Sequence, residues 1–307
     1  MMVLGFDTSN YTTSVATFDG VHGENRSRLL DVKQGELGLR QSDAVFAHVK
    51  RLPELAEALF ENKEPSAVRA IGVSTRPRAV EGSYMPCFLA GVSAARTMAA
   101  ALHVPCYAFS HQQGHIAAAL WSANRMDLMQ QPHLAWHLSG GTTELLLVEP
   151  EDRNVKATRI GGTGDISAGQ IMDRTGKLLQ LPFPSGKALD QLSRQAEKPE
   201  RFKVKTKDLT FSFSGLENKV MAYAADHRPE DIAAYAVYSV CDAIVRTTVD
   251  ALKAYPDFPV VFSGGVASNS MLREQCKRFE PIFAEPALST DNAMGIAVLT
   301  WLQEERL

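Results

Sequence analysis

His111 and His115 are the side chains whose type and spacing most directly suggest chemistry. Residues four apart lie on one face of a helix, and two imidazoles in that relation commonly form half of a metal site. By itself such a pair is more often plain helix surface. Gln112 stands where an HExxH metalloprotease carries its glutamate, so the general base for proteolysis is missing.

An oxygen ligand would complete a site of two histidines and one carboxylate with open coordination positions. Asp291 is the candidate, because the segment Ser289-Thr290-Asp291-Asn292 precedes an expected final helix. An aspartate at that place is also typical of a helix N-cap, which is the alternative interpretation. Nitrogen and oxygen ligands of this kind suit iron and zinc equally.

Three turns of small residues are candidates for binding a nucleotide. Such turns expose backbone N–H groups and hydroxyls that bind phosphate, although any one of them is also an ordinary tight turn. Their recurrence favours ATP or an acyl-adenylate as a ligand. The candidate residues are Asp7 and Ser9 in the first turn, Ser139, Gly140, Gly141 and Thr142 in the second, and Gly264, Gly265 and Asn269 in the third.

Asp173 and Asp190 lie on two expected helices after the second turn, and Gly186 begins the second of these helices. A carboxylate that points into a nucleotide site would accept hydrogen bonds from ribose hydroxyls. The alternative is that both are exposed helix carboxylates. A separate basic run, Lys203, Lys205 and Lys207, alternates like a solvated edge strand rather than an RNA site.

The elements that would hold these residues repeat along the chain. Apolar runs at 3–6 and 12–18 flank the first turn, and runs at 134–138 and 145–148 flank the second, so each half begins with a β-hairpin. The first half continues with a helix at 43–62, which Pro53 must kink or divide, a strand at 68–74, a helix at 84–102 and a strand at 104–109. The second half has helices at 167–181, 186–196 and 229–254 and a strand at 260–262.

This order predicts an α/β protein of two duplicated domains around a nucleotide cleft. The expected domains are residues 1–130 and 131–290, and a last helix within 291–307 is expected to pack back on the first domain. The length of 307 residues is sufficient for two domains with separate cores.

Composition limits the partners and the location. The chain has 32 Lys and Arg against 35 Asp and Glu, a net charge of −3, so charge gives no support for free-standing nucleic-acid binding. Its four cysteines are scattered, which favours buried thiols in a reducing compartment. Polar residues interrupt the longest uncharged stretch, 97–124, and no signal-peptide pattern opens the chain. We therefore expect a cytoplasmic protein without a membrane anchor.

Several motifs in one order and spacing resemble the TsaD family, whose members were formerly called O-sialoglycoprotein endopeptidases or glycoproteases. The resemblance spans nearly the whole chain. The motifs are Leu4-Gly5-Phe6-Asp7-Thr8-Ser9, His111-x-x-x-His115, Ser139-Gly140-Gly141, Thr163-x-Asp165 with Gly169 and Asp173, Pro184-Ser185-Gly186 with Asp190, Phe211-Ser212-Phe213-Ser214-Gly215-Leu216, Gly264-Gly265-Val266-Ala267-Ser268-Asn269 and Thr290-Asp291-Asn292-Ala293.

The resemblance implies the superfold of actin, sugar kinases and heat-shock ATPases (ASKHA), which has two ribonuclease-H-like domains. It implies transfer of a threonylcarbamoyl group from threonylcarbamoyl-adenylate to the adenine beside the tRNA anticodon, by an enzyme that works with TsaB-like and TsaE-like partner proteins. By the same resemblance, His111, His115 and Asp291 would hold one divalent iron or zinc ion. The adenylate would be held by Ser139, Gly140, Gly141, Asp173, Gly186, Asp190 and Asn269.

The chain also departs from the family pattern. Arg76-Pro77-Arg78 replaces Gly-Pro-Gly, and Thr142 replaces a histidine. Ile166 replaces an aspartate and Gln170 a glutamate. Added guanidinium groups and lost carboxylates alter ligand choice electrostatically. These departures favour a divergent paralogue.

Two other hypotheses remain open. In one, the chain is a nucleotide-dependent carbamoyltransferase or ATPase that acts on a substrate other than tRNA. In the other, it is a non-catalytic partner that forms a homodimer or heterodimer through the helix at 43–62. The metal candidates argue against a purely structural role.

Overall fold

The computed structural model describes residues 1–9, 12–31, 39–285 and 293–305. The chain forms two compact units. Unit 1 comprises Met1–Gln131, Glu149–Ala157 and Ala287–Leu307, and unit 2 comprises Pro132–Val148 and Thr158–Pro286. Each unit has its own sheet and its own buried apolar side chains.

Unit 1 contains a five-stranded sheet in the order β3-β2-β1-β4-β5. The strands β1 (Met2–Ser9), β2 (Thr12–Phe18) and β3 (Gly23–Leu29) form an antiparallel meander. β4 (Val68–Arg76) runs parallel to β1, and β5 (Cys106–Ser110) runs parallel to β4. The opening hairpin is therefore confirmed. Sequence analysis missed β3, because its exposed, charged residues give no apolar alternation.

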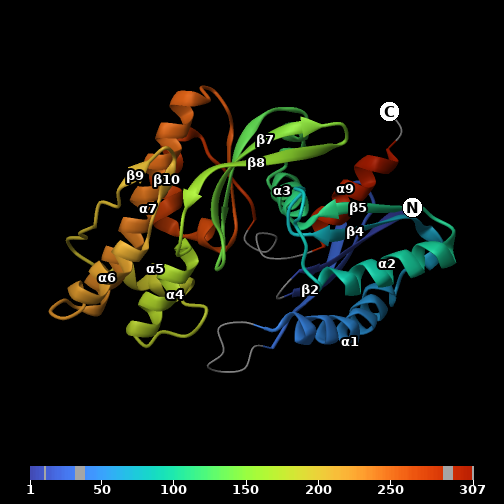
Figure 1. Cartoon of the computed structure of the whole chain (residues 1–307), viewed down its shortest axis with the longest axis horizontal. Coiled ribbons are helices and arrows are strands. Elements are labelled where there is room, and N and C mark those ends of the chain that lie inside the picture. Colours follow the sequence, from blue (N-terminus) through green and yellow to red (C-terminus); the bar gives the residue numbers. More distant parts are fainter. Residues whose placement is uncertain (10–11, 32–38, 286–292, 306–307) are drawn as a thin grey trace. The chain divides into compact units, whose positions relative to one another are not determined.

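Helices cover both faces of this sheet (Figure 1). On one face lie α1 (Gln41–Phe60) and α2 (Phe88–Leu102). On the other face, α9 (Met294–Glu304) packs on β1 and β4 and against α3 (His111–Ser122). Two short 3₁₀ turns, Pro65–Ala67 and Met126–Gln130, complete the unit. Pro53 was expected to kink or divide α1. The helix continues through Pro53 over 20 residues, so the division is wrong.

Close contacts between α9 and its neighbours depend on glycine. A Cβ atom at Gly5 would lie 2.7 Å from the carbonyl oxygen of Ala293, and one at Gly295 would collide with the backbone of Gly114. Because these positions lack side chains, α9 lies directly on β1 and α3. This packing fixes the start of α3, where His111 and His115 lie.

The sheet of unit 2 repeats the arrangement of the first sheet in its central strands. Its order is β12-β11-β6-β7-β8-β10-β9, so β8-β7-β6-β11-β12 corresponds to β3-β2-β1-β4-β5. As in unit 1, the first strand, β6 (His133–Leu138), is antiparallel to β7 (Thr143–Glu151) and parallel to β11 (Val260–Ser263). The other strands are β8 (Asn154–Thr163), β12 (Ile282–Phe283), and the two-residue strands β9 (Thr206–Lys207) and β10 (Thr210–Phe211).

The core of unit 2 is built around α7 (Pro229–Ala254). It packs against α4 (Ala168–Leu178), α5 (Gly186–Ser193), α6 (Ser214–Tyr223) and α8 (Ser270–Cys276). Short 3₁₀ turns at Gly265–Ser268 and Lys277–Phe279 flank α8. Among the described residues, α7 alone is long and apolar enough to cross a membrane, but 72% of its apolar window is buried inside the protein. Such burial is typical of a core helix.

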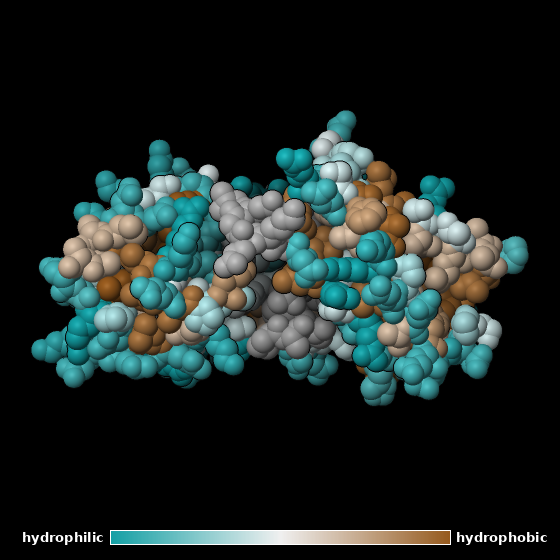
Figure 2. All heavy atoms as spheres, turned by 90° about the horizontal axis from the view of Figure 1, so that it is seen from below, coloured by the Kyte–Doolittle hydropathy of each residue, from teal (hydrophilic) through white to brown (hydrophobic). Residues whose placement is uncertain are grey.

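Some sequence expectations need correction. Cys106 is exposed, unlike the other three cysteines. The basic run forms no continuous strand: Lys203 and Lys205 precede β9, and only Lys207 belongs to it. The helix expected from Tyr84 begins at Phe88, because residues 84 and 85 have no regular structure and residues 86 and 87 form a turn. Hydrophilic residues cover most of the face drawn in Figure 2, with hydrophobic residues gathered in smaller groups between them.

Candidate functional site

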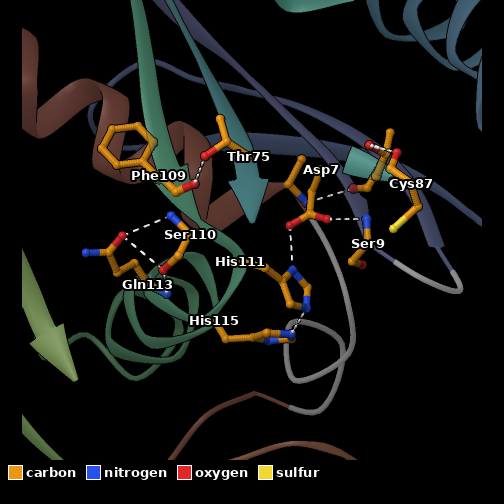
Figure 3. Close-up of polar contacts among 12 residues, drawn as sticks. Asp7, Ser9, Thr75, Cys87, Phe109, Ser110, His111, Gln113 and His115 are labelled. Atoms are coloured by element: carbon orange, nitrogen blue, oxygen red, sulfur yellow. Dashed lines mark hydrogen bonds and ion pairs between the residues drawn. The ribbon is translucent and has the colours of Figure 1, made fainter. Parts of the chain in front are cut away.

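Asp7 at the end of β1 and His111 at the start of α3 form the centre of a polar cluster in unit 1 (Figure 3). The Nδ1 atom of His111 lies 2.7 Å from Oδ2 of Asp7. Its Nε2 atom lies 2.9 Å from Nε2 of His115, and the two rings meet edge to face at 79°. Asp7 and His115 are buried, at 1% and 7% exposure. The predicted helical face with two imidazoles is therefore present, and it is joined to a carboxylate.

The first turn of α3 holds the histidines in place. Ser110 accepts a hydrogen bond from the N–H of Gln113, whose side chain in turn accepts one from the N–H of Ser110. This reciprocal capping box satisfies N–H groups that the helix start leaves open. Thr75 on β4 donates to the carbonyl of Phe109, just before the cap. The orientation of His111 thus depends on the strand ends as well as on its own helix.

The second oxygen of Asp7 is also engaged. Oδ1 accepts a hydrogen bond of 2.8 Å from the N–H of Ser9. The predicted role of Ser9 as a turn residue thus involves its backbone, and its Oγ is buried without a hydrogen-bond partner among the described residues. With both oxygens fixed, the carboxylate can accept a hydrogen bond from the Nδ1–H of His111. In that tautomer Nε2 carries the lone pair.

The histidine pair fits two ligands of one metal ion. Two nitrogens at about 2.0–2.1 Å from a shared ion are roughly 2.9–3.4 Å apart, and the observed separation is 2.9 Å. A carboxylate on the far nitrogen of a ligating histidine is the usual second partner at such sites. Asp291, the expected third ligand, lies outside the described residues. Within the described residues no group of three or more His, Cys, Asp or Glu side chains is arranged to hold a metal ion.

His48 on α1 is a buried histidine that sequence analysis missed. Its Nδ1 lies 2.8 Å from the hydroxyl of Thr13, and the side chain is fully buried. Burial lowers the pKa of His48 to about 4, against the opposing charge of Asp7. Burial also raises the pKa of the nearby Cys87 thiol to about 11, so this cysteine is an inert core group. His48 lies in the helix expected at 43–62, but no local signal in the sequence distinguished it.

In unit 2, the turn of Ser139, Gly140, Gly141 and Thr142 is closed and seated on α4. Thr142 donates its N–H to Oγ of Ser139, and Ser167 donates its hydroxyl to the carbonyl of Gly140 at 2.6 Å. A Cβ atom at Gly169 would lie 2.6 Å from Gly140, so glycine there lets α4 approach the turn. At Gly140 and Gly141 a Cβ atom would meet open space. The turn therefore leaves room for a ligand against its backbone.

The third predicted turn lies beside this one. Gly264 has φ +91°, and a Cβ atom there would collide with the backbone of Leu138, the residue before Ser139. The two sheet strands that end in these turns are also neighbours, with Ser263 opposite His137. The predicted set of small residues from the second and third turns is thus brought together at one edge of the sheet.

Asp190 on α5 ties the start of α8 to this region. Its carboxylate accepts hydrogen bonds from Nδ2 of Asn269 and from the hydroxyl and N–H of Ser270. Asn269 also caps α8 by accepting from the N–H of Leu272. Asp190 is therefore a structural acceptor in this structure rather than an exposed helix carboxylate.

Asp173 on α4 accepts a hydrogen bond of 2.8 Å from the N–H of Ser185, next to Gly186. Burial raises the pKa of Asp173, and this hydrogen bond opposes the shift. Asp173, in the middle of α4, thus contacts the residue that precedes Gly186, the first residue of α5. Sequence analysis placed them on adjacent helices but could not pair them.

Asp165 holds a second loop in place and was not among the predicted ligand residues. Burial opposes ionisation of its carboxyl, but hydrogen bonds from the hydroxyls of Ser212 and Ser214 and from the N–H of Phe213 hold its pKa well below the usual range. The motif around Phe211–Leu216 is thus attached to the segment before α4. The role of Asp165 visible here is structural.

Comparison with known proteins identifies the family. The family model described as "TsaD: tRNA N6-adenosine threonylcarbamoyltransferase" matches residues 32–298. The chain belongs to the TsaD family. Relatives named tRNA N6-adenosine threonylcarbamoyltransferase include those of Thermotoga neapolitana, 31% identical over 97% of this chain and 92% of the relative, and Nitrosomonas europaea, 30% identical over 100% and 94%.

Solved structures confirm the fold of this TsaD-family chain. HypF of T. kodakarensis superposes with a TM-score of 0.63 at 13% identity, over 98% of this chain and 47% of that one. The (R)-2-hydroxyglutaryl-CoA dehydratase component A of Acidaminococcus fermentans gives 0.59 at 15% identity over the full length of both. The ROK hexokinase of Thermus thermophilus gives 0.53 at 16% identity over 99% of both chains. The predicted actin-like ATPase (ASKHA) fold is confirmed.

The departures from the TsaD pattern have different structural meanings. Gln170 completes a capping box with Ser167 at the start of α4, a role that glutamine and glutamate share. Ile166 packs against the core of unit 2. Thr142 closes the turn through its backbone. Arg76 and Arg78 are both exposed.

Proposed function

We propose that this chain transfers a threonylcarbamoyl group to an adenosine of tRNA. Membership of the TsaD family across residues 32–298 carries the proposal. The Asp7, His111 and His115 cluster supports it, because two adjacent imidazoles, one of them oriented by a carboxylate, could supply two ligands of a metal ion. The chain is an enzyme of the transferase class by the same relationship.

The metal would be held by His111, His115 and Asp291, as one divalent iron or zinc ion. Bound there, the ion would polarise an oxygen of the donor as a Lewis acid. Asp7 would fix the tautomer of His111 by accepting its Nδ1 proton, so that Nε2 is available as a ligand. A buried carboxylate also offsets part of the positive charge that the site acquires.

The donor would be threonylcarbamoyl-adenylate, made from ATP. Open space over Gly140 and Gly141 supports an approach of phosphate to their N–H groups. Gly264 and Gly265 would line the nucleotide site beside this turn. Asp173 and Gly186, with Asp190 and Asn269, would bind or position the nucleoside, because a carboxylate is suited to ribose hydroxyls.

The reaction needs no covalent enzyme intermediate. The N6 amine of the acceptor adenine would attack the carbamoyl carbon, a C–N bond would form, and the bond to the adenylate oxygen would break. AMP would carry away the electron pair of that bond, and the N6 nitrogen would lose one proton. The contribution of the protein is therefore positioning and charge stabilisation.

Partner proteins would complete the enzyme in the cytoplasm. Phe46 and Val49 on α1 are 67% and 56% exposed, so α1 presents apolar side chains outside its own unit. We propose this face for a homodimer or for a heterodimer with a TsaB-like partner, with a TsaE-like protein as a further partner. Exposed apolar groups on a regular helix are typical of such contacts.

A second candidate function keeps the nucleotide chemistry and changes the acceptor. Arg76-Pro77-Arg78 and Thr142 differ from the family pattern near the ends of β4 and β6. These departures are the observation behind the alternative, a carbamoyltransferase or ATPase with a substrate other than tRNA. A non-catalytic role receives less support, because a scaffold has no need of the linked carboxylate and two imidazoles.

The test is reconstitution of the reaction. Purified chain, TsaB-like and TsaE-like partners, threonylcarbamoyl-adenylate and unmodified tRNA are combined, and the nucleosides are analysed by mass spectrometry. The expected product is threonylcarbamoyladenosine, lost in His111→Ala and kept in His22→Ala, whose imidazole is exposed. Absence of the product with a wild-type chain that binds the donor would favour the second candidate.

A further inference from the structure

The loop of residues 77–87 joins β4 to α2 and is attached to the start of α3 at its first end. Arg76 pairs with Ser110, the N-cap of α3, across the strands β4 and β5. Pro77 then accepts a hydrogen bond of 3.0 Å from the N–H of Gln112. Arg76 and Arg78 therefore flank Pro77, which is hydrogen-bonded to Gln112, the neighbour of His111.

The second end of the loop is attached beside Asp7 and His111. Thr8, the neighbour of Asp7, donates its hydroxyl to the carbonyl of Cys87 at 3.0 Å. The ring of Phe88 lies 6.1 Å from the ring of His111. The loop therefore begins and ends beside the polar cluster.

The middle of the loop is compact and presents a mixed surface. The N–H of Arg78 donates to the hydroxyl of Ser83, and the N–H of Ser83 donates to the carbonyl of Val80. The first hydrogen bond brings Ser83, the neighbour of Tyr84 in the chain, next to Arg78. Tyr84 is 62% exposed and Val80 53%, and both arginines are exposed. Glu81, also exposed, adds one negative charge to the same loop.

We propose that Arg76, Arg78 and Tyr84 bind the single-stranded RNA around the acceptor adenosine. The inference rests on the proposed function and names the part of the chain that recognises its RNA substrate. Guanidinium groups bind phosphate in two-pronged geometry, and an exposed phenol ring stacks on an unpaired base. Sequence-dependent recognition of RNA typically uses loops whose bases are unstacked in this way.

Charge and chemistry favour RNA over the small donor as the occupant. With a net charge of −3 the chain has no broad basic surface, so contacts to RNA phosphates must be local. A carboxylate or phosphate of the donor would use the guanidinium groups alone and would leave the exposed Tyr84 and Val80 without a role. Bases next to a phosphate use all of these groups.

The probe is an unmodified RNA hairpin that contains the anticodon stem and loop, with binding measured by fluorescence anisotropy on the full chain together with its partners. We expect Arg76→Ala with Arg78→Ala to lower RNA affinity at least tenfold and to reduce the salt dependence of binding by one to two phosphate contacts, roughly. Tyr84→Ala should weaken binding about tenfold, whereas Tyr84→Phe keeps the ring and should bind as the wild type does.

Arg96→Ala is the matched control, because Arg96 is an exposed arginine on α2 about two turns beyond its start. It should leave RNA affinity unchanged. Donor binding, followed by thermal shift with an acyl-adenylate analogue, should be the same in all variants. If the arginine variant loses donor binding and keeps RNA binding, or if the wild type does not bind the hairpin, the inference is wrong.

These outcomes separate the inference from the proposed function. Modification of tRNA that is insensitive to the loop variants would overturn the inference and keep the function. RNA binding that requires the three side chains, without any modified nucleoside, would support the inference and overturn the function.

Discussion

Asp7 and His111 are 104 positions apart in the chain, and their side chains meet at 2.7 Å between Oδ2 and Nδ1. The contact joins the first strand of unit 1 to the first residue of α3, across β4 and β5. It sets which nitrogen of His111 faces His115. The candidate metal ligands therefore depend on a residue that would not itself touch the metal.

Asp7→Asn tests that dependence. The amide can place an N–H donor toward Nδ1, which favours the tautomer with the proton on Nε2 and removes the lone pair that a metal needs. We expect metal affinity to fall about 10- to 100-fold, as is usual when the outer partner of a ligating histidine is lost. Competition titration with a chromogenic chelator measures it.

Asp152→Asn is the matched control for this experiment. Asp152 is exposed and has φ +52°, a conformation that asparagine adopts readily, so metal affinity should stay at the wild-type value. Equal affinity in Asp7→Asn and in the wild type would refute the role given to Asp7.

Gly264→Ala tests the junction of the two small-residue turns of unit 2. The substitution places a Cβ atom against the backbone of Leu138 and keeps φ at +91°, both of which oppose any residue except glycine. We expect a loss of about 2–4 kcal/mol in the free energy of unfolding. Urea denaturation followed by circular dichroism measures it.

Gly265→Ala provides the comparison, because a Cβ atom at Gly265 meets open space. Its free energy of unfolding should lie within about 0.5 kcal/mol of the wild type. Similar losses in both variants would show that the collision with Leu138 is not the cause.

Sequence patterns predicted the elements that bury regular apolar faces. The helix at 229–254 matches α7 residue for residue, because its apolar positions repeat with helical periodicity inside the core of unit 2. Both hairpins, β1 with β2 and β6 with β7, were predicted from two apolar runs that flank a turn. Strands with mostly exposed or mixed side chains, such as β3 and β8, gave no alternation to detect.

The candidate site was predictable only as separate pieces. Spacing alone placed His111 and His115 on one helical face, since that relation is local. The contacts of Asp7 with His111 and of Asp190 with Asn269 join residues far apart in the chain, and only the folded sheet brings them together. His48 was missed because its burial, which lowers its pKa, is a tertiary property.

His48 predicts a pH dependence of stability. Its pKa is about 4 in the folded chain against an ordinary value of 6.5, so the folded state holds the neutral form. The stabilisation is present above pH 6.5 and is lost as the pH falls from 6.5 to 4, because the unfolded chain binds the proton first. The loss amounts to at most about 3 kcal/mol.

Free energies of unfolding measured by urea titration at several pH values check this. In His48→Gln the free energy of unfolding should fall less between pH 6.5 and 4 than it does in the wild type. The slope of this free energy against pH should be smaller by up to the equivalent of one bound proton. His103→Gln, at an exposed position, should keep the wild-type slope. An unchanged slope in His48→Gln would show that His48 does not titrate with folding.

Gly141→Ala separates ligand binding from folding in the turn that follows β6. Among the described residues, chain neighbours apart, no atom lies within 4 Å of the added Cβ, so the free energy of unfolding should change by less than about 0.5 kcal/mol. If phosphate of the adenylate approaches the backbone there, the added methyl group occupies its space, and affinity for an acyl-adenylate analogue should fall roughly tenfold. Gly215→Ala, also in open space but at the start of α6, should keep both quantities. Isothermal titration calorimetry measures the affinity. An unchanged affinity in Gly141→Ala would show that the nucleotide does not bind against this turn.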